Sequence, residues 1–218
     1  MCLGFDARAS APYMHDMTPR SIIRMGHPTL ARPADPVAEP TGQEVRDLIA
    51  DMEASMRLAG GVGLAAPQIA ESLRVIVFEV PARRAGEADD AGPIELTALI
   101  NPSFEVLDAT IELGWEGCLS IPGLRGEVPR PARIRYTGIG RDGTVIERTA
   151  SGFHARVVQH EIDHLYGVLY LERMTDMRRI GFTQEMLEFG APAQDSHTQD
   201  LTGPEPTSQE PTSGEADD

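Results

Sequence analysis

The sequence contains no lysine, because all 19 of its basic residues are arginine. Schiff-base catalysis and phosphate-binding loops that depend on a lysine are therefore excluded. Cysteine is nearly absent too: Cys2 and Cys118 are the only two, which is too few for a disulfide framework. No apolar run approaches the roughly 18 residues that a membrane-spanning helix needs. We expect a soluble protein of the reducing cytoplasm, without a membrane partner.

Acidic residues are in excess, but they are unevenly distributed. The formal net charge is -15, and nine of the 34 acidic residues lie after position 184, where there is no arginine. The rest of the chain is therefore only mildly acidic. This balance argues against a bulk electrostatic attraction to nucleic acid, so we expect no direct DNA binding.

A chain of 218 residues fits one compact domain with additional tails. Residues 1–18 and 191–218 are rich in small, polar or acidic residues, which bury too little apolar surface to offset the entropy of ordering. We expect a disordered N-terminal extension over 1–18, a catalytic domain over 19–190 and a disordered acidic tail over 191–218. We also expect the protein to be a monomer.

Periodicity predicts three helices separated from a block of strands. Thr41 and Glu44 have the spacing of a capping box, before an apolar face that ends at Gly60. The other expected elements are helices over 151–167 and 176–189, strands over 74–80, 96–100, 104–113, 133–139 and 144–150, and a long loop or hairpin over 81–93. Asp142-Gly143 is typical of a hairpin turn. This order predicts an α+β fold, with mostly antiparallel sheets around a central metal-binding helix; a parallel, doubly wound sheet is the alternative.

The most informative segment is His160-Glu161-Ile162-Asp163-His164 within the second predicted helix. Histidines four residues apart lie one turn apart on the same side of a helix, so both can ligate one metal ion. Glu161 then lies beside the ion, where a carboxylate can accept a proton during hydrolysis. Two solvated histidines on a charged helix face are the alternative, but this helix is too apolar for that.

A catalytic metal site of this kind usually has a third protein ligand. Tyr170 stands where a metzincin protease would have its third histidine, so that class is excluded. Three downstream acids are poorly placed for the role: Glu172, Glu185 and Glu188. The other candidate is Cys118, which lies at a sharp bend of the chain, and thiolate suits transition metals. A buried, inert cysteine is the alternative reading.

A third segment, 61–68, joins the first helix to the following strand and reads Gly-Val-Gly-Leu-Ala-Ala-Pro-Gln. Its glycines permit close approach of another backbone, and the side-chain amide of Gln68 can polarise a carbonyl. Alone, such a segment is more often only a turn.

Taken together and in this order, segments 61–68, 116–120 (Glu-Gly-Cys-Leu-Ser) and 159–165 (Gln-His-Glu-Ile-Asp-His-Leu) resemble the three motifs of the peptide deformylase family. The resemblance extends over about 21–171. It implies a metal-dependent hydrolase that removes the formyl group from the N-terminal formylmethionine of nascent polypeptides. It further implies one divalent metal ion, typically Fe2+, with Ni2+, Co2+ or Zn2+ able to replace it.

The resemblance also implies roles for individual residues. Cys118, His160 and His164 would be metal ligands, Glu161 the general acid and base, and Gln68 with the backbone N–H of Leu119 the oxyanion donors. Val62, Gly63 and Arg125 would bind substrate. Transient contact with the ribosome would follow from the nature of the substrate, although the acidic C-terminal region lacks the basic residues that usually support it.

Two residues are candidates for supporting this site. Arg130 is a candidate anchor for Glu116, and Asp163 for a neighbouring arginine or loop; an ordinary surface charge is the alternative for both Arg130 and Arg125. Two other functions also remain open: a generic zinc endopeptidase that shares the helix but not the role of Cys118, and a non-catalytic metal-binding scaffold.

Overall fold

The computed structural model describes residues 18–85 and 92–191. Apart from Thr18 and Ala191, the expected extension and acidic tail lie outside these residues, as does the middle of the expected 81–93 loop. No helix in the described part of the chain is both long and apolar enough to cross a membrane.

The described strands form one antiparallel sheet with the order β1-β2-β3-β4-β5, and β6 pairs with β4. Their bounds are β1 Gly63–Ala65, β2 Val75–Val80, β3 Ile94–Cys118, β4 Ile121–Ile139, β5 Val145–Ser151 and β6 Ile180–Phe182. The helices are α1 Gln43–Leu58, α2 Gly152–His164 and α3 Thr183–Phe189, with short 3-10 turns at Pro28–Ala31, Ala66–Ile69 and Tyr170–Arg173. The α+β prediction is confirmed.

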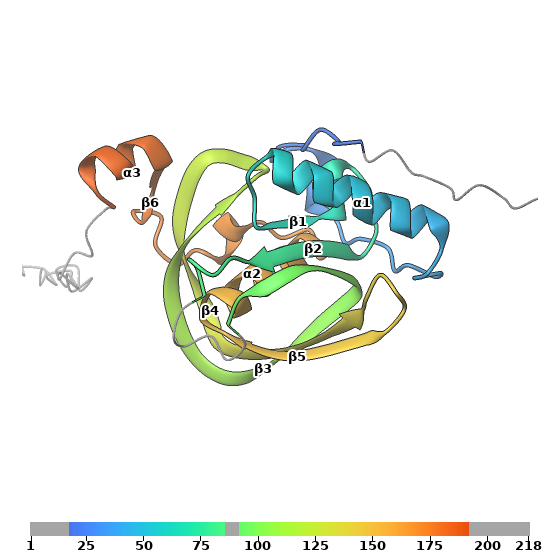
Figure 1. Ribbon diagram of the computed structural model, residues 1–218. Helices are drawn as coiled ribbons and strands as arrows, with labels where there is room; N and C mark the ends of the chain where they lie inside the picture. The colour runs from blue at the N-terminus through green and yellow to red at the C-terminus, as the bar shows by residue number, and fades with distance from the viewer. Residues whose placement is uncertain (1–17, 86–91, 192–218) are drawn as a thin grey trace, which may run out of the picture.

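The sheet curls around α2, and α1 covers β1 and β2 on the other side (Figure 1). One apolar cluster joins the inner face of the sheet to α2 through Phe78, Tyr136, Val158 and Ile162. A second cluster packs the apolar face of α1 against the opposite side. The helix that carries the predicted ligands is therefore held between sheet strands, so its position is fixed by core packing.

The predicted capping box of α1 is wrong. The helix begins one residue later than that motif requires, with Gly42 as its N-cap and no side-chain cap hydrogen bond. Gly42 N–H donates to the carbonyl of Glu39, which turns the chain just before the helix. The expected end at Gly60 agrees with its φ of 68°, a conformation that favours glycine.

The strands around the site are longer than periodicity predicts. β3 and β4 run as 25- and 19-residue strands, where the sequence suggested three short ones. Prolines and glycines interrupt the apolar alternation, yet they are accommodated because the β3–β4 register shifts at several positions. The resulting bends let the pair wrap around α2.

The third predicted helix is only partly correct. Its first half is a turn around Asp176, whose side chain accepts from Arg178 N–H, followed by β6, which pairs with Leu124–Gly126 of β4. Only Thr183–Phe189 is helical, and none of its side chains is buried. The Asp142-Gly143 hairpin is confirmed, with a φ of 84° at Gly143 between β4 and β5.

Candidate metal centre and hydrolytic site

α2 places His160, Glu161 and His164 in the interior of the protein. All three are less than 10% exposed, because the helix is anchored by apolar neighbours such as Val158 and Ile162. The imidazole rings of His160 and His164 are 5.1 Å apart between centroids, one turn from each other. The two histidines are therefore buried on the same side of the helix, as their spacing in the sequence predicts.

Cys118 reaches these histidines from the end of β3. Residues 119 and 120 form a tight turn into β4, and Cys118 pairs with Ile121 across it. The Cys118 Sγ lies 3.4 Å from His164 Nε2, and one ligand atom from each of the three residues lies within 4.8 Å of the others. One sulfur and two imidazole nitrogens are a donor set that fits a divalent transition metal with a position left for another ligand.

Glu116 fixes the orientation of His160. Its Oε2 lies 2.7 Å from His160 Nδ1, and Arg130 donates to both of its carboxylate oxygens at 2.9 and 3.0 Å. Burial would raise the pKa of Glu116, but hydrogen bonds from His160 and Arg130 outweigh it and hold that pKa well below its usual value. With Nδ1 engaged, His160 presents Nε2 to the metal site.

Arg130 extends this network to Asp163. Its Nη1 lies 2.5 Å from Asp163 Oδ2, and Arg173 donates to Asp163 at 2.8 Å. The hypotheses that Arg130 anchors Glu116 and that Asp163 holds an arginine are both confirmed. Asp163 belongs to α2, Arg130 to β4 and Glu116 to β3, so these ion pairs attach the metal-binding helix to both strands.

Glu161 is buried beside the metal ligands. Burial raises its pKa to about 7, with a smaller opposing effect of His160. Its Oε2 has no hydrogen-bond partner among the described residues. A Cβ atom on Gly63 would lie 2.2 Å from Glu161 Oε1, so glycine is required there for the carboxylate to fit. A carboxylate that titrates near neutral pH suits proton transfer.

Gln68 presents its amide donors to the same site. Its Oε1 accepts from Ala65 N–H at 2.8 Å, which leaves Nε2 to contact Cys118 Sγ at 3.4 Å and Ser120 Oγ at 3.2 Å. Leu119 lies in the turn immediately after Cys118. The structure thus brings Gln68 and Leu119 to the cysteine from two different segments.

One cavity of about 410 Å³ connects these groups, a volume within the range of small-ligand sites. Eight of the nine site residues predicted from the sequence line it, Val62, Gly63 and Arg125 among them; the ninth, His164, contacts the lining residue Cys118. Arg125 also donates to the Trp115 carbonyl at 3.2 Å. Sequence reasoning missed two lining residues of α2, Phe153 and Arg156. For Arg156, the available signal was its position one turn before His160.

Comparisons with known proteins agree with this site. The family described as Polypeptide deformylase matches residues 19–180. "Peptide deformylase 2" of Ralstonia nicotianae is 51% identical over 165 residues, which cover 76% of this chain and 92% of that protein. "Peptide deformylase 1" of Xanthomonas campestris is 52% identical over 163 residues, covering 75% and 94%. A Met-Ala-Ser-bound class I type b peptide deformylase from Acinetobacter baumannii has a TM-score of 0.65 at 32% identity, covering 72% and 99%.

Proposed function

Because the chain belongs to the peptide deformylase family, we propose that Glu161 is the acid–base residue with which it hydrolyses the formyl group of N-terminal formylmethionine. The overall reaction, deformylation of nascent polypeptides with release of formate, follows from the family. The role of Glu161 is supported by its burial, its unpartnered Oε2 and its raised pKa. The endopeptidase and scaffold alternatives are not favoured by the family.

Cys118, His160 and His164 would hold one divalent metal ion, and we propose Fe2+, with Ni2+, Co2+ or Zn2+ able to replace it. Cysteine sulfur and imidazole nitrogen suit all of these ions. When bound, the metal supplies Lewis-acid chemistry and makes water a better nucleophile at neutral pH.

Residues of the chain itself transfer the proton and stabilise the developing negative charge. The Glu161 carboxylate accepts a proton from the attacking water and later delivers it to the nitrogen of the departing amine. Gln68 Nε2 and the Leu119 N–H donate to the oxygen that becomes negative as the formyl carbon turns tetrahedral. The Gln68 donors are held in advance, since Ala65 N–H fixes the other end of the amide.

The substrate is proposed to bind as an extended chain along the cavity. Gly63 would pair with its backbone, Val62 would contact the methionine side chain, and Arg125 would lie near the peptide beyond it. All three line the cavity that also contains Cys118 and Glu161.

Formate release from formyl-Met-Ala-Ser, compared with acetate release from acetyl-Met-Ala-Ser, tests the proposed function. Protein loaded anaerobically with iron is expected to turn over the formyl peptide only, because the hydrolytic end of the cavity receives a small acyl group. Cleavage of internal peptide bonds without a formyl preference would instead indicate an endopeptidase. Failure to release formate would contradict the proposal.

Replacing Cys118 with alanine is expected to remove the metal. The cluster then keeps only two imidazoles, and protein sites of this kind usually need three ligands. Metal analysis after anaerobic purification should give well under one equivalent, compared with about one for the unmodified protein. The matched control is Ser120→Ala, which alters the adjacent turn without removing a ligand. Full metal occupancy in the Cys118 variant would contradict the assignment.

Replacing Gln68 with glutamate is expected to lower kcat by about 10²–10³, because a carboxylate replaces a donor to the developing negative charge. The substitution preserves the shape of the side chain and the acceptor for Ala65 N–H, so the local fold should be retained. Steady-state kinetics at equal metal content measure the effect. An unchanged kcat would exclude Gln68 as an oxyanion donor.

We further propose that residues 19–190 form the catalytic domain and that the protein acts as a cytoplasmic monomer, in transient contact with the ribosome. The ribosome contact is supported by the substrate, which emerges from the ribosome. An electrostatic contact through α3 is not supported, because this helix carries Glu185 and Glu188 and no arginine. Co-sedimentation with ribosomes at low salt is expected to retain the protein weakly, and equilibrium sedimentation without ribosomes is expected to give the mass of one chain.

A further inference from the structure

A largely buried arginine of α2, Arg156, lines the cavity. Arg156 lies four residues, or about one turn, before His160, which is about 6 Å along the helix, and its side chain is 12% exposed. Phe153 and Val157 of the same helix line the cavity beside it. A charged group in this position is costly to bury unless its hydrogen bonds are satisfied.

Hydrogen bonds hold the Arg156 guanidinium against strands β3 and β4. Its Nη1 donates to the Val128 carbonyl at 2.8 Å and to Glu116 Oε1 at 2.9 Å, and its Nη2 donates to the Glu112 carbonyl at 2.8 Å. Both strands therefore hold the side chain. Arg156 is in this way a fixed part of the cavity wall, unlike a flexible surface arginine.

Gly114 provides the space for this guanidinium. It pairs with Val128 across the two strands, and a Cβ atom on it would lie 2.8 Å from Cζ, Nε and Nη2 of Arg156. Any other residue at 114 would push the guanidinium off the strands. The strands close one side of the guanidinium, and Arg156 also lines the cavity.

We propose that Arg156 is a specificity-determining residue: with Gly114 behind it, its guanidinium closes the end of the substrate side-chain pocket and limits the side-chain length that the pocket accepts. This rests on the proposed function, because it assigns the wall beyond the hydrolytic groups to the first residue of the formylated peptide. An unbranched side chain that starts next to His160 and runs along α2 meets Arg156 one turn away.

The proposal predicts that two substitutions, one of Arg156 and one of Gly114, change the preferred side-chain length in opposite directions. Arg156→Ala deepens the pocket, whereas Gly114→Ala pushes Arg156 into it. Glu116 keeps both hydrogen bonds from Arg130 in either variant, so the orientation of His160 should persist.

The experiment compares kcat/KM for formyl-Xaa-Ala-Ser peptides in which Xaa has an ethyl, butyl or hexyl side chain. A hydrophobic pocket typically discriminates about 10-fold or more per misfit methylene. Arg156→Ala is therefore expected to raise the hexyl-to-butyl ratio about 10-fold, and Gly114→Ala to raise the ethyl-to-butyl ratio by a similar factor. Because each ratio is taken on one preparation, incomplete metal loading cancels.

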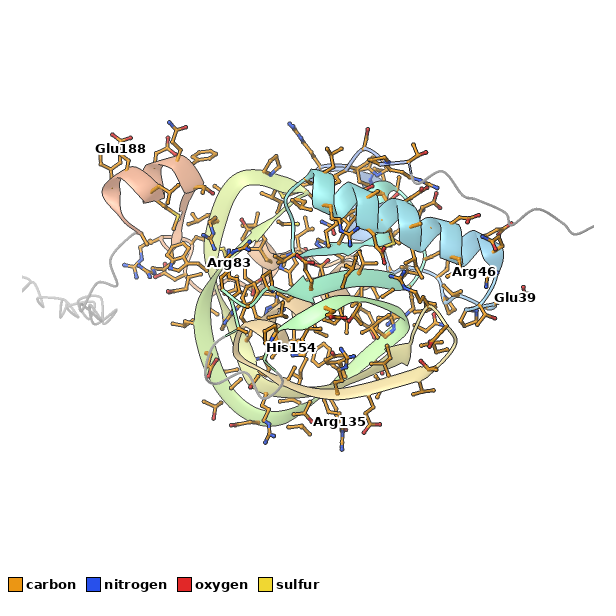
Figure 2. The ribbon with its side chains drawn as sticks, in the orientation of Figure 1. Glu39, Arg46, Arg83, Arg135, His154 and Glu188 are labelled. Carbon is orange, nitrogen blue, oxygen red and sulfur yellow. The ribbon has the colours of Figure 1, made fainter. Side chains whose placement is uncertain are left out.

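Three comparisons separate this role from a structural one. Arg135→Ala is the matched control: Arg135 lies at the rim of the molecule opposite α1 (Figure 2) and is half-exposed, so all ratios should stay unchanged. The double variant should behave like Arg156→Ala, because the added methyl then meets no guanidinium. Calorimetric affinities for the unformylated peptides should follow the same order without any turnover.

Unchanged ratios in Arg156→Ala, or shifts of both single variants in the same direction, would overturn the proposal. Failure of the unmodified protein to deformylate the butyl peptide would be a different result, since it contradicts the proposed function itself.

Discussion

Replacing Glu161 with glutamine is expected to lower kcat for formyl-Met-Ala-Ser by about 10²–10⁴, the usual contribution of a general acid–base group. Glutamine has the same shape, so it fits the space beside Gly63, but it can neither accept the proton of water nor deliver it to the amine. Cys118, His160 and His164 are untouched, so the metal content should stay the same. Formate release at equal metal content measures the loss.

The matched control for that experiment is Glu188→Gln, the same chemical change on α3 at the far end of the molecule (Figure 2). Glu188 lies outside the cavity that contains Glu161, so its replacement should leave kcat unchanged. If the Glu161 variant kept full turnover, another group would have to move the proton, and the assignment of Glu161 would be wrong.

The metal cluster could be predicted from the sequence because local rules determine most of its geometry. His160 and His164 face the same way on any helix, and the apolar residues in and around this segment predict burial. The position of Cys118 relative to the histidines could not be predicted from local rules. Nothing local brings it 3.4 Å from His164, and its inclusion depended on the order of three motifs that resemble a family.

The long strands were not predictable in the same way, because their regularity is a tertiary effect. Pro129 and Pro131 face Leu113 and Ile111 within the β3–β4 pair, positions where propensity argues for interruption. Register shifts and the packing of the pair around α2 override that local preference. Expectations based on alternation therefore made the strands too short, ending β3 too early and starting β4 too late.

Arg156 was missed for a related reason. In the sequence it is one of many arginines, and its exposed or buried state depends on a glycine 42 positions earlier on another element. Only the structure shows that Gly114 leaves room for the guanidinium. Complementary pairs of this kind have no signal in either segment alone.

Replacing Arg130 with methionine is expected to destabilise the fold by about 3–5 kcal/mol, the range for removing one partner of a buried ion pair. Arg130 is 4% exposed and lies between two buried carboxylates, Glu116 and Asp163. Methionine fills a similar space but leaves Glu116 with Arg156 and His160, and Asp163 with Arg173. The fold loses stability because the two buried carboxylates stay desolvated while part of the opposite charge that compensates them is removed. Urea unfolding of metal-loaded protein at neutral pH measures the change.

Arg135→Met is the control for Arg130, because it also removes an arginine from β4 and from an ion pair. Arg135 and its partner Glu105 are 45% and 57% exposed, and such surface pairs contribute less than about 1 kcal/mol. The two variants should therefore differ by at least 2 kcal/mol in unfolding free energy. The Arg130 variant should also bind metal more weakly, since Glu116 then orients His160 with fewer supports. Equal, small effects of both substitutions would show that the buried network does not hold α2 in place.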